Sequence, residues 1–252
     1  MTERAPSYSD QEPGPRDDYL GSLRRSRLNR TRDDRPPVFH LAGREWDLLA
    51  SVFPPVFSPS TQALLELLDF PVGGSVLEMG CGAGVIAVSA ALAGCARVVA
   101  TDVNPAAARN AELNAQRHGV ADRVHCVSGD LFEPLHPEDT FDLVFWHSNF
   151  VLAPTAMDDL NMHDLAYVDP GYRAHCGYLA QAPDRVREGG VALLGFSSRG
   201  DLSRLRSLAA DVDVEVDVLG TNPVQERDTV VEYQLLRLRS GSPRSTRPGS
   251  TW

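Results

Sequence analysis

The sequence predicts an α/β domain built on a doubly wound, seven-stranded sheet. Short apolar, β-branched runs alternate along the chain with stretches of helical periodicity, which is typical of a parallel sheet covered by helices. The run at 141–146 consists largely of apolar residues, as expected for a central strand buried on both faces. A glycine-rich turn follows the predicted strand Ser75–Met79 directly, where such folds place a ligand.

The remaining elements are predicted in chain order. Residues 38–50 are expected to form a short hairpin or helix, Pro54-Pro55 interrupts the chain, and an amphipathic helix is expected at 61–70, with Ser60 or Thr61 as its N-cap. Further strands are predicted at 98–102, 123–127, 141–146 and 191–196, and helices from the glycine turn to 93 and at 105–117, 170–188 and 202–210. Gly189-Gly190 is expected to end the helix at 170–188. Two alternating runs, 212–219 and 229–239, predict an antiparallel pair at the sheet edge.

Composition divides the chain into four parts. Residues 1–37 are rich in Pro, Ser, Arg and Asp and are expected to be either a disordered tail or a lid over the site, with a short basic helix as a candidate at 20–28. Residues 38–72 are predicted to be an N-terminal helical extension, and 73–239 the main domain, which contains the glycine-rich turn. Residues 240–252 are predicted to be a second disordered tail.

The overall composition excludes several classes of function. The chain has 252 residues, of which 42% are hydrophobic and 23% charged, as in ordinary globular domains. It contains no apolar run long enough for a membrane span and no apolar signal region at the N-terminus, so the expected compartment is the cytoplasm. Four cysteines without a C-x-x-C pair predict reduced thiols and no metal site.

The charged residues are unevenly distributed and argue against a nucleic-acid partner. All 24 basic residues are arginines, which excludes mechanisms that need a lysine Schiff base or a P-loop lysine. Residues 38–239 carry 14 arginines and 27 acids, a net charge of −13. Because such a surface repels phosphates, no nucleic-acid substrate is expected.

The turn after Ser75–Met79 has the pattern E-x-G-x-G-x-G, with Glu78 at the strand end and glycines at 80, 82 and 84. Glycines permit positive φ and leave backbone N–H groups uncovered, and the following helix N-terminus favours electron-rich ligand groups. Asp102 ends the next predicted strand, 22 residues after Gly80. An acid at that position suits a ribose diol; the alternative is that Asp102 only caps the next helix.

In this pattern the sequence resembles the class I S-adenosylmethionine-dependent methyltransferases over residues 56–238, and within them the release-factor glutamine methyltransferase group. The resemblance implies a Rossmann-like fold and S-adenosyl-L-methionine as cofactor. It also implies that Asp130 contacts the adenine amino group and that Leu131 packs on the ring. The implied cofactor-binding residues are Glu78, Gly80, Cys81, Gly82, Gly84, Asp102, Val103, Asp130, Leu131 and His147.

The reacting site is expected at the end of the run 141–146. The resembled glutamine methyltransferases carry Asn-Pro-Pro-Tyr there, whereas this sequence has His147-Ser148-Asn149-Phe150, which argues against a glutamine amide as the acceptor. His147 is a candidate general base, with a histidine bonded inside the loop as the alternative. Asn149 is a candidate orienting group, and Tyr172 is a candidate to face the sulfonium with its hydroxyl or ring.

Three other polar positions near this site carry weaker expectations. His163 and Asp164, in the long stretch that follows, are expected to be surface residues, with a role in shaping the substrate pocket as the alternative. Arg199 is a candidate to hold a substrate carboxylate, with a solvated arginine as the alternative.

The predicted function is therefore methyl transfer from S-adenosylmethionine to an oxygen or nitrogen of a small molecule or peptide group. One alternative is cyclisation of the cofactor's own aminocarboxypropyl arm to azetidine-2-carboxylate, with release of methylthioadenosine. A second alternative is a non-catalytic, cofactor-binding subunit. No nucleic-acid or membrane partner is predicted, and the sequence does not indicate the oligomeric state.

Overall fold

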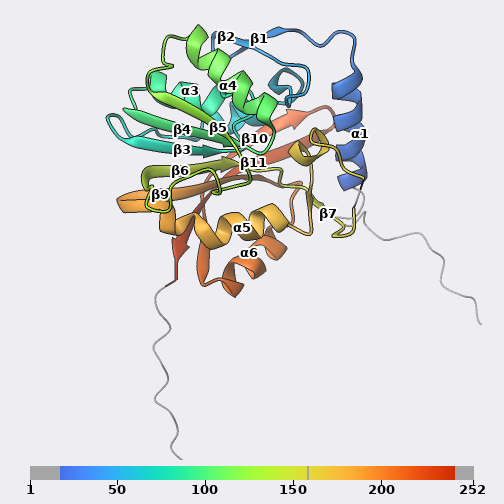
Figure 1. The fold of residues 1–252 in the computed structure, drawn as a ribbon. Coiled ribbons are helices and arrows are strands. Elements are labelled where there is room, and N and C mark those ends of the chain that lie inside the picture. Colours follow the sequence, from blue (N-terminus) through green and yellow to red (C-terminus); the bar gives the residue numbers. More distant parts are fainter. Residues whose placement is uncertain (1–17, 158, 242–252) are drawn as a thin grey trace, which may run out of the picture.

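The computed structural model describes residues 18–157 and 159–241, and its centre is a seven-stranded sheet between two layers of helices (Figure 1). The sheet order is β10-β11-β9-β6-β3-β4-β5. The strands are β3 (Ser75–Met79), β4 (Arg97–Asp102), β5 (Val124–Ser128), β6 (Phe141–His147), β9 (Val186–Ser197), β10 (Val214–Glu226) and β11 (Thr229–Ser240). The strands from β9 to β5 pair in parallel, whereas β11 is antiparallel to both β9 and β10. The predicted fold class is confirmed.

The helices cover the two faces of the sheet in pairs. Helices α3 (Val85–Leu92) and α4 (Pro105–Arg117) lie on one face, and α5 (Arg173–Gln181) and α6 (Leu202–Asp211) lie on the other (Figure 1). Side chains alternate along each strand, so Val76 of β3 belongs to the first core and its neighbour Leu77 to the second. This double burial explains why the central strands are almost continuously apolar.

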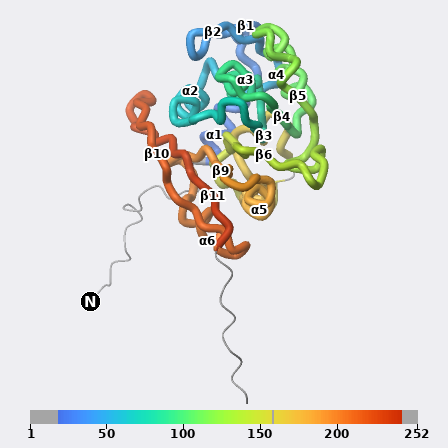
Figure 2. Tube along the Cα trace, turned by 90° about the vertical axis from the view of Figure 1, so that its left-hand side faces the viewer, coloured from blue at the N-terminus to red at the C-terminus, as the bar shows by residue number. Residues whose placement is uncertain are grey.

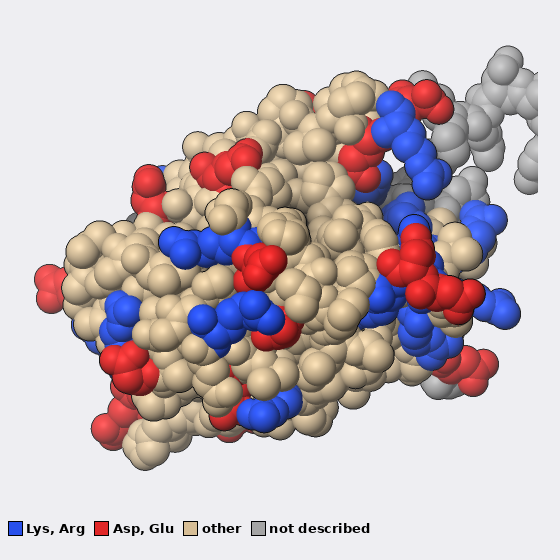
Figure 3. All heavy atoms as spheres, turned by 90° about the horizontal axis from the view of Figure 1, so that it is seen from above, with Lys and Arg blue, Asp and Glu red and all other residues tan. Residues whose placement is uncertain are grey.

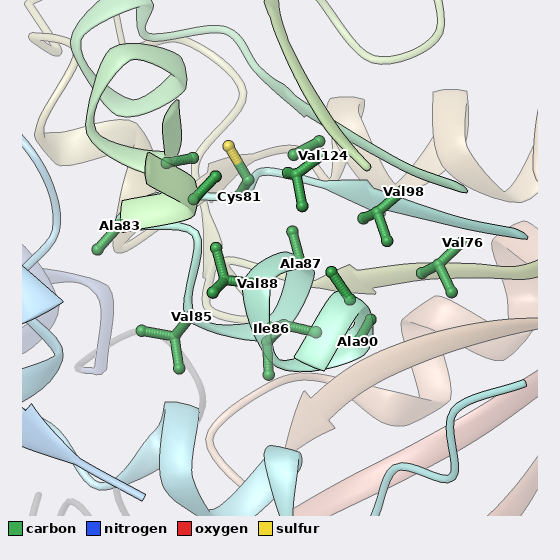
Figure 4. Close-up of a cluster of buried hydrophobic side chains, with 14 of the residues drawn as sticks. Val76, Cys81, Ala83, Val85, Ile86, Ala87, Val88, Ala90, Val98 and Val124 are labelled. Carbon is green, nitrogen blue, oxygen red and sulfur yellow. The ribbon is translucent and has the colours of Figure 1, made fainter. Parts of the chain in front are cut away.

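The first core includes residues of the glycine turn that precedes α3. Figure 4 shows α3 side chains facing valines of three parallel strands, with Cys81 and Ala83 of the turn beside them. Val76, Val98 and Val124 supply the strand side of this cluster, and each is at most 5% exposed. The turn is thus fixed to the sheet by hydrophobic packing on the side away from solvent.

The N-terminal part of the described chain differs from the prediction in both its strands and its helices. Residues 38–50 include a hairpin, and the helix expected at 61–70 ends at residue 65. Pro59 is the N-cap residue and no side chain caps the helix. Ser60 and Thr61, one of which was expected to be the N-cap, lie inside the first turn instead. The elements are α1 (Asp18–Thr31), β1 (Val38–Leu41), β2 (Arg44–Asp47), η2 (Pro55–Phe57) and α2 (Ser60–Leu65). Residues 1–17 lie outside the described chain.

The helix at 170–188 was predicted too long. Helix α5 ends at Gln181, the 3-10 turn η4 (Pro183–Arg185) follows, and β9 begins at Val186. Pro183 has no backbone N–H to donate to the carbonyl oxygen of Leu179, so the α-helical hydrogen-bond pattern ends before it. Gly189 and Gly190 lie inside β9 and do not end the helix. A Cβ at Gly190 would lie 2.6 Å from the Asp142 carbonyl oxygen, beside the irregular register between β6 and β9.

The other elements agree closely with prediction, including Ser75–Met79 and Pro105–Arg117, whose bounds are reproduced. Asn104 caps α4 by accepting the Ala106 N–H at 3.0 Å. The expected antiparallel pair is confirmed and longer than predicted, and its hairpin extends along α2 (Figure 2). Within residues 18–157 and 159–241, no helix is long and apolar enough to cross a membrane.

Candidate active site

A cavity of about 550 Å³ opens at the carboxyl ends of β3, β4 and β6. Its lining includes the glycine turn, the residues after β5 and β6, part of α1 and the hairpin end of β10 and β11. This is where open α/β sheets bind ligands, and the volume is within the range of small-molecule sites. Ten of the twelve sequence-predicted site residues line it: Glu78, Gly80, Cys81, Gly82, Asp102, Val103, Asp130, Leu131, His147 and Asn149.

The three glycines of the turn have different roles. All adopt positive φ, at 62°, 53° and 77° for Gly80, Gly82 and Gly84. A Cβ at Gly82 would meet nothing within 4 Å, whereas one at Gly84 would lie 2.6 Å from the Cα of Ala111 in α4. Gly84 does not line the cavity; it permits the close approach of α3 and α4. Its expected role in cofactor binding is therefore corrected to one in helix packing.

Two acidic side chains stabilise the turn by accepting hydrogen bonds from backbone N–H groups. The Glu78 carboxylate accepts the Ala87 N–H at 2.7 Å, and Asp102 accepts the N–H groups of Gly82 at 2.9 Å and Asn104 at 2.8 Å. Burial raises the pKa of Glu78 well above its usual value and also raises the pKa of Asp102. Asn104, and not Asp102, is the N-cap of α4, and Asp102 lines the cavity.

At the β6 tip, His147 lines the cavity with a depressed pKa. Burial lowers this pKa to about 4, because the imidazolium would be poorly solvated there. His147 is thus neutral at physiological pH, with one nitrogen able to accept a hydrogen bond.

Asn149 lies two residues further on and is oriented by the protein itself. Its Nδ2 donates to the carbonyl oxygens of Leu165 at 2.7 Å and Val168 at 2.9 Å. Its Oδ1 is buried without a partner among the described residues. The donor half of the amide therefore fixes the loop after β6, and only the acceptor half is left unbonded.

Tyr172 has a structural role, which corrects its prediction as a catalytic residue. Its side chain is 0% exposed and does not line the cavity. The hydroxyl donates to the Phe150 carbonyl oxygen at 2.7 Å and accepts the Asp201 N–H at 2.8 Å. Both hydrogen-bonding functions are used inside the protein, and the ring packs near His175 and Phe196.

The segment after β6 forms a small lobe that the sequence did not predict, and we call it the η3 lobe. It includes β7 (Leu152–Ala153), the 3-10 turn η3 (Asp164–Ala166) and β8 (Asp169–Pro170), and it packs against α1. His163, expected at the surface, is 4% exposed.

Ser26 connects helix α1 to this lobe through side-chain hydrogen bonds. Its hydroxyl donates to Asp164 Oδ1 at 2.6 Å and lies 2.8 Å from His163 Nδ1. Since the carboxylate can only accept, Nδ1 of His163 donates to Ser26. Asn29 adds a bond to the Tyr167 hydroxyl at 2.9 Å.

Helix α1 consequently forms one wall of the cavity. Ser22, Arg25 and Asn29 line it from this helix, and α1 lies beside the η3 lobe (Figure 1). Of the two expectations for residues 1–37, the disordered tail does not hold for 18–31, which are helical and packed. Only long-range contacts could have indicated this.

At the far side of the cavity, Arg199 is already paired. Its guanidinium contacts Glu226 at 2.9 Å, and the same carboxylate accepts the Tyr233 hydroxyl. All three residues line the cavity. Arg199 thus neutralises an acid of this protein and is not free for a substrate carboxylate. Among the described residues, no group of three or more His, Cys, Asp or Glu side chains is placed to hold a metal ion.

Comparison with known proteins agrees with this geometry. Residues 76–163 match the family described as a methyltransferase domain. The chain is 33% identical to a release factor glutamine methyltransferase of Gloeobacter violaceus over 211 residues, covering 76% of this chain and 71% of that protein. It is 36% identical to the enzyme of the same name from Bordetella pertussis, covering 62% of each. The chain belongs to the class I S-adenosylmethionine-dependent methyltransferases.

The matches differ in extent and in what they show. A ribosomal protein L11 methyltransferase of Pelotomaculum thermopropionicum is 44% identical, but over only 40% of this chain and 34% of that protein. The chain spans less than two thirds of the Bordetella and Pelotomaculum relatives. The tRNA m1G37 methyltransferase of M. jannaschii superposes with a TM-score of 0.55 at 17% identity, covering 84% of this chain and 56% of that one. At this identity the likeness concerns the fold alone.

Proposed function

We propose that this chain binds S-adenosylmethionine in the cavity and transfers its methyl group to an oxygen or nitrogen of a peptide group or small molecule. The observation that carries the proposal is that the glycine turn, Asp102 and His147 open into one cavity. Cofactor-holding groups and a polar group at the expected acceptor position thus share a single space, as a direct transfer requires.

The residues present fit the cofactor. Gly80 and Gly82 leave the turn open at positive φ, and Asp102 lies next to the turn through its bond to Gly82, where a carboxylate can accept from a ribose diol. Asp130 and Leu131 line the cavity beyond β5, where an adenine would meet a polar and an apolar group. When bound, the cofactor supplies an electrophilic methyl on a sulfonium.

The chain's own residues would orient the acceptor. His147 is neutral because burial lowers its pKa to about 4, and Asn149 has only its carbonyl oxygen left. Both can accept a hydrogen bond, which favours an acceptor group with N–H or O–H over a carboxylate. A base with so low a pKa removes a proton weakly, so positioning of the nucleophile is the main contribution of these residues.

The acceptor class is inferred from the relatives and from the charge of the chain. The named relatives act on a release factor and on ribosomal protein L11, which makes protein side chains the first acceptors to test. Nucleic acid remains the less suitable partner, because the chain between the tails is acidic and phosphate binding needs a basic surface. On the face seen in Figure 3, basic and acidic side chains are interspersed.

The test is product analysis of the purified protein with labelled S-adenosylmethionine. Release factor, L11 and a small-molecule extract serve as acceptors, and an incubation without acceptor is the control. S-adenosylhomocysteine formed only with an acceptor is the expected result. Methylthioadenosine formed without any acceptor would establish cofactor cyclisation instead, and binding without either product would establish a non-catalytic subunit.

A further inference from the structure

Trp146, the next-to-last residue of β6, has a polar atom that the fold does not use. Its side chain is 6% exposed and lines the cavity. The ring is held by His175 at 4.7 Å and Tyr178 at 5.2 Å between ring centroids. The ring packs as expected for the buried run 141–146, whereas this packing gives the indole nitrogen no hydrogen-bond partner.

Two other buried aromatic donors have acceptors within the protein. Tyr178 donates to the Leu193 carbonyl oxygen at 2.7 Å and Trp46 to that of Leu41 at 3.0 Å. For Trp146, no residue among 18–157 and 159–241 accepts a hydrogen bond from the indole N–H. The Trp146 indole nitrogen is not among the fully buried unpaired atoms of the described residues, so it is reachable from the cavity that Trp146 lines. A ligand bound in this cavity can therefore accept the hydrogen bond that the protein leaves unmade.

The indole nitrogen lies directly over the first glycine of the turn. A Cβ at Gly80 would lie 3.0 Å from Trp146 Nε1, closer than side chains normally approach. Gly80 therefore leaves room for the indole to lean across the end of β3. The N–H is presented to the cavity at the boundary between the glycine turn and the β6 tip.

The sheet order determines which end of the cofactor reaches this point. The tips follow in the order β6, β3, β4 and β5, with His147 on β6, Asp102 on β4 and Asp130 after β5. If the proposed function holds, the methyl must face His147 at the acceptor side. The amino-acid arm shares the sulfur with that methyl, so it lies near β6, while ribose and adenine lie towards β4 and β5.

We infer that the Trp146 indole N–H binds the carboxylate of the cofactor's amino-acid arm. That carboxylate is the cofactor's only anionic group, and the nearest charged side chains of the turn are acids, Glu78 and Asp102. A neutral donor on a rigid, buried ring can hold the anion without a counter-ion. Trp146 would then be a cofactor-positioning residue that selects for the carboxylate.

The test compares two ligands on matched variants by calorimetry. Trp146→Phe keeps the aromatic ring and removes the N–H, and Trp46→Phe removes a buried indole N–H outside the cavity. The ligands are S-adenosylmethionine and its decarboxylated analogue. We expect Trp146→Phe to weaken S-adenosylmethionine about tenfold and the decarboxylated analogue less than twofold, with Trp46→Phe changing neither. Thermal melting confirms that each variant is folded.

The outcomes separate this inference from the proposed function on which it rests. Equal weakening of both ligands would assign Trp146 to packing alone and overturn the inference, as would unchanged affinity for both. If the wild type binds neither ligand, the proposed function itself fails and the inference falls with it. If the wild type binds S-adenosylmethionine but Trp146→Phe changes the affinity for both ligands by the same factor, the proposed function stands and this inference alone is refuted.

Discussion

The cavity has two halves that differ in how the chain builds them. We call the glycine turn with Asp102 and Asp130 the cofactor half, and the β6 tip with the η3 lobe and α1 the acceptor half. In the cofactor half, the stabilising bonds join residues 2 to 20 positions apart, such as Asp102 with Asn104 and Asp102 with Gly82. In the acceptor half, Ser26 and Asn29 bond to partners 137 and 138 positions away.

This difference indicates which half of the cavity tolerates amino-acid substitution. In the cofactor half, short-range hydrogen bonds from the strand ends hold the backbone of the glycine turn in one conformation. The acceptor half is assembled from a loop and a helix that meet only in the folded protein, and loops on a rigid scaffold are where specificity changes. We therefore expect substitutions in the cofactor half to affect folding and cofactor affinity, and those in the acceptor half to affect acceptor use.

The largest expected effect is that of Gly84→Ala. The new Cβ would meet Ala111 at 2.6 Å, and the residue must keep a φ of 77°. Overpacking and the left-handed conformation together predict a loss of about 3 kcal/mol or more in the free energy of unfolding, measured by urea denaturation. Gly82→Ala, which meets nothing within 4 Å, is the control and should lose about 1–2 kcal/mol. Equal losses would show that Gly84 is not a packing residue.

The next effect concerns His163 and the dependence of stability on pH. Burial lowers the pKa of His163 to about 4, so between pH 6.5 and 4 the unfolded chain binds a proton that the folded chain does not. Stability from this residue is present above pH 6.5 and is lost as pH falls towards 4, by at most about 3 kcal/mol. Unfolding of His163→Gln should show a flatter pH dependence in this window. An unchanged slope would contradict the burial of a neutral imidazole.

A smaller effect is expected for the acceptor half through His147. His147→Ala should lower kcat about tenfold or more while leaving the affinity for S-adenosylmethionine unchanged, with His125→Ala on the exposed side of β5 as the control. Because the pKa of His147 is about 4, this side chain stays neutral between pH 6 and 8. The kcat of the wild type should therefore show no titration of His147 in that range. A rate that falls with a pKa near 6.5 would show an ordinary, solvated histidine.

The smallest expected effect is local and concerns α1. Ser26→Ala removes the hydroxyl that bonds to His163 and Asp164, at a cost of about 1–2 kcal/mol. Hydrogen exchange across α1 and η3 should become faster, with the acceptor KM changed and cofactor affinity retained. Arg24→Ala, on the exposed side of the same helix, should leave exchange unchanged. Equal exchange in both variants would mean that Ser26 does not hold the helix.

The two halves also differ in how far they could be predicted. The strand Ser75–Met79, the turn and Asp102 follow from local patterns of apolar residues, glycines and acids, and the structure places them together. Gly84 was assigned to the ligand because the pattern does not show that α4 comes within contact of it.

The acceptor half was harder because its residue types have no distinctive local pattern. Nothing around His163 indicates that a serine 137 positions earlier would bury it. Tyr172 looked like a cavity residue, because its bonds to Phe150 and Asp201 depend on the folded arrangement. The sequence does show the alternation that builds the sheet, and it leaves open which distant segments cover its end.

The most direct test of the central claim is the binding of S-adenosylmethionine to the wild type, Asp102→Asn and Asp217→Asn by titration calorimetry. Asp102 lies at the cofactor turn, whereas Asp217 forms exposed ion pairs on β10. We predict one site in the wild type, affinity about tenfold weaker in Asp102→Asn and no change in Asp217→Asn. No binding to the wild type, or equal affinity in all three proteins, would contradict it.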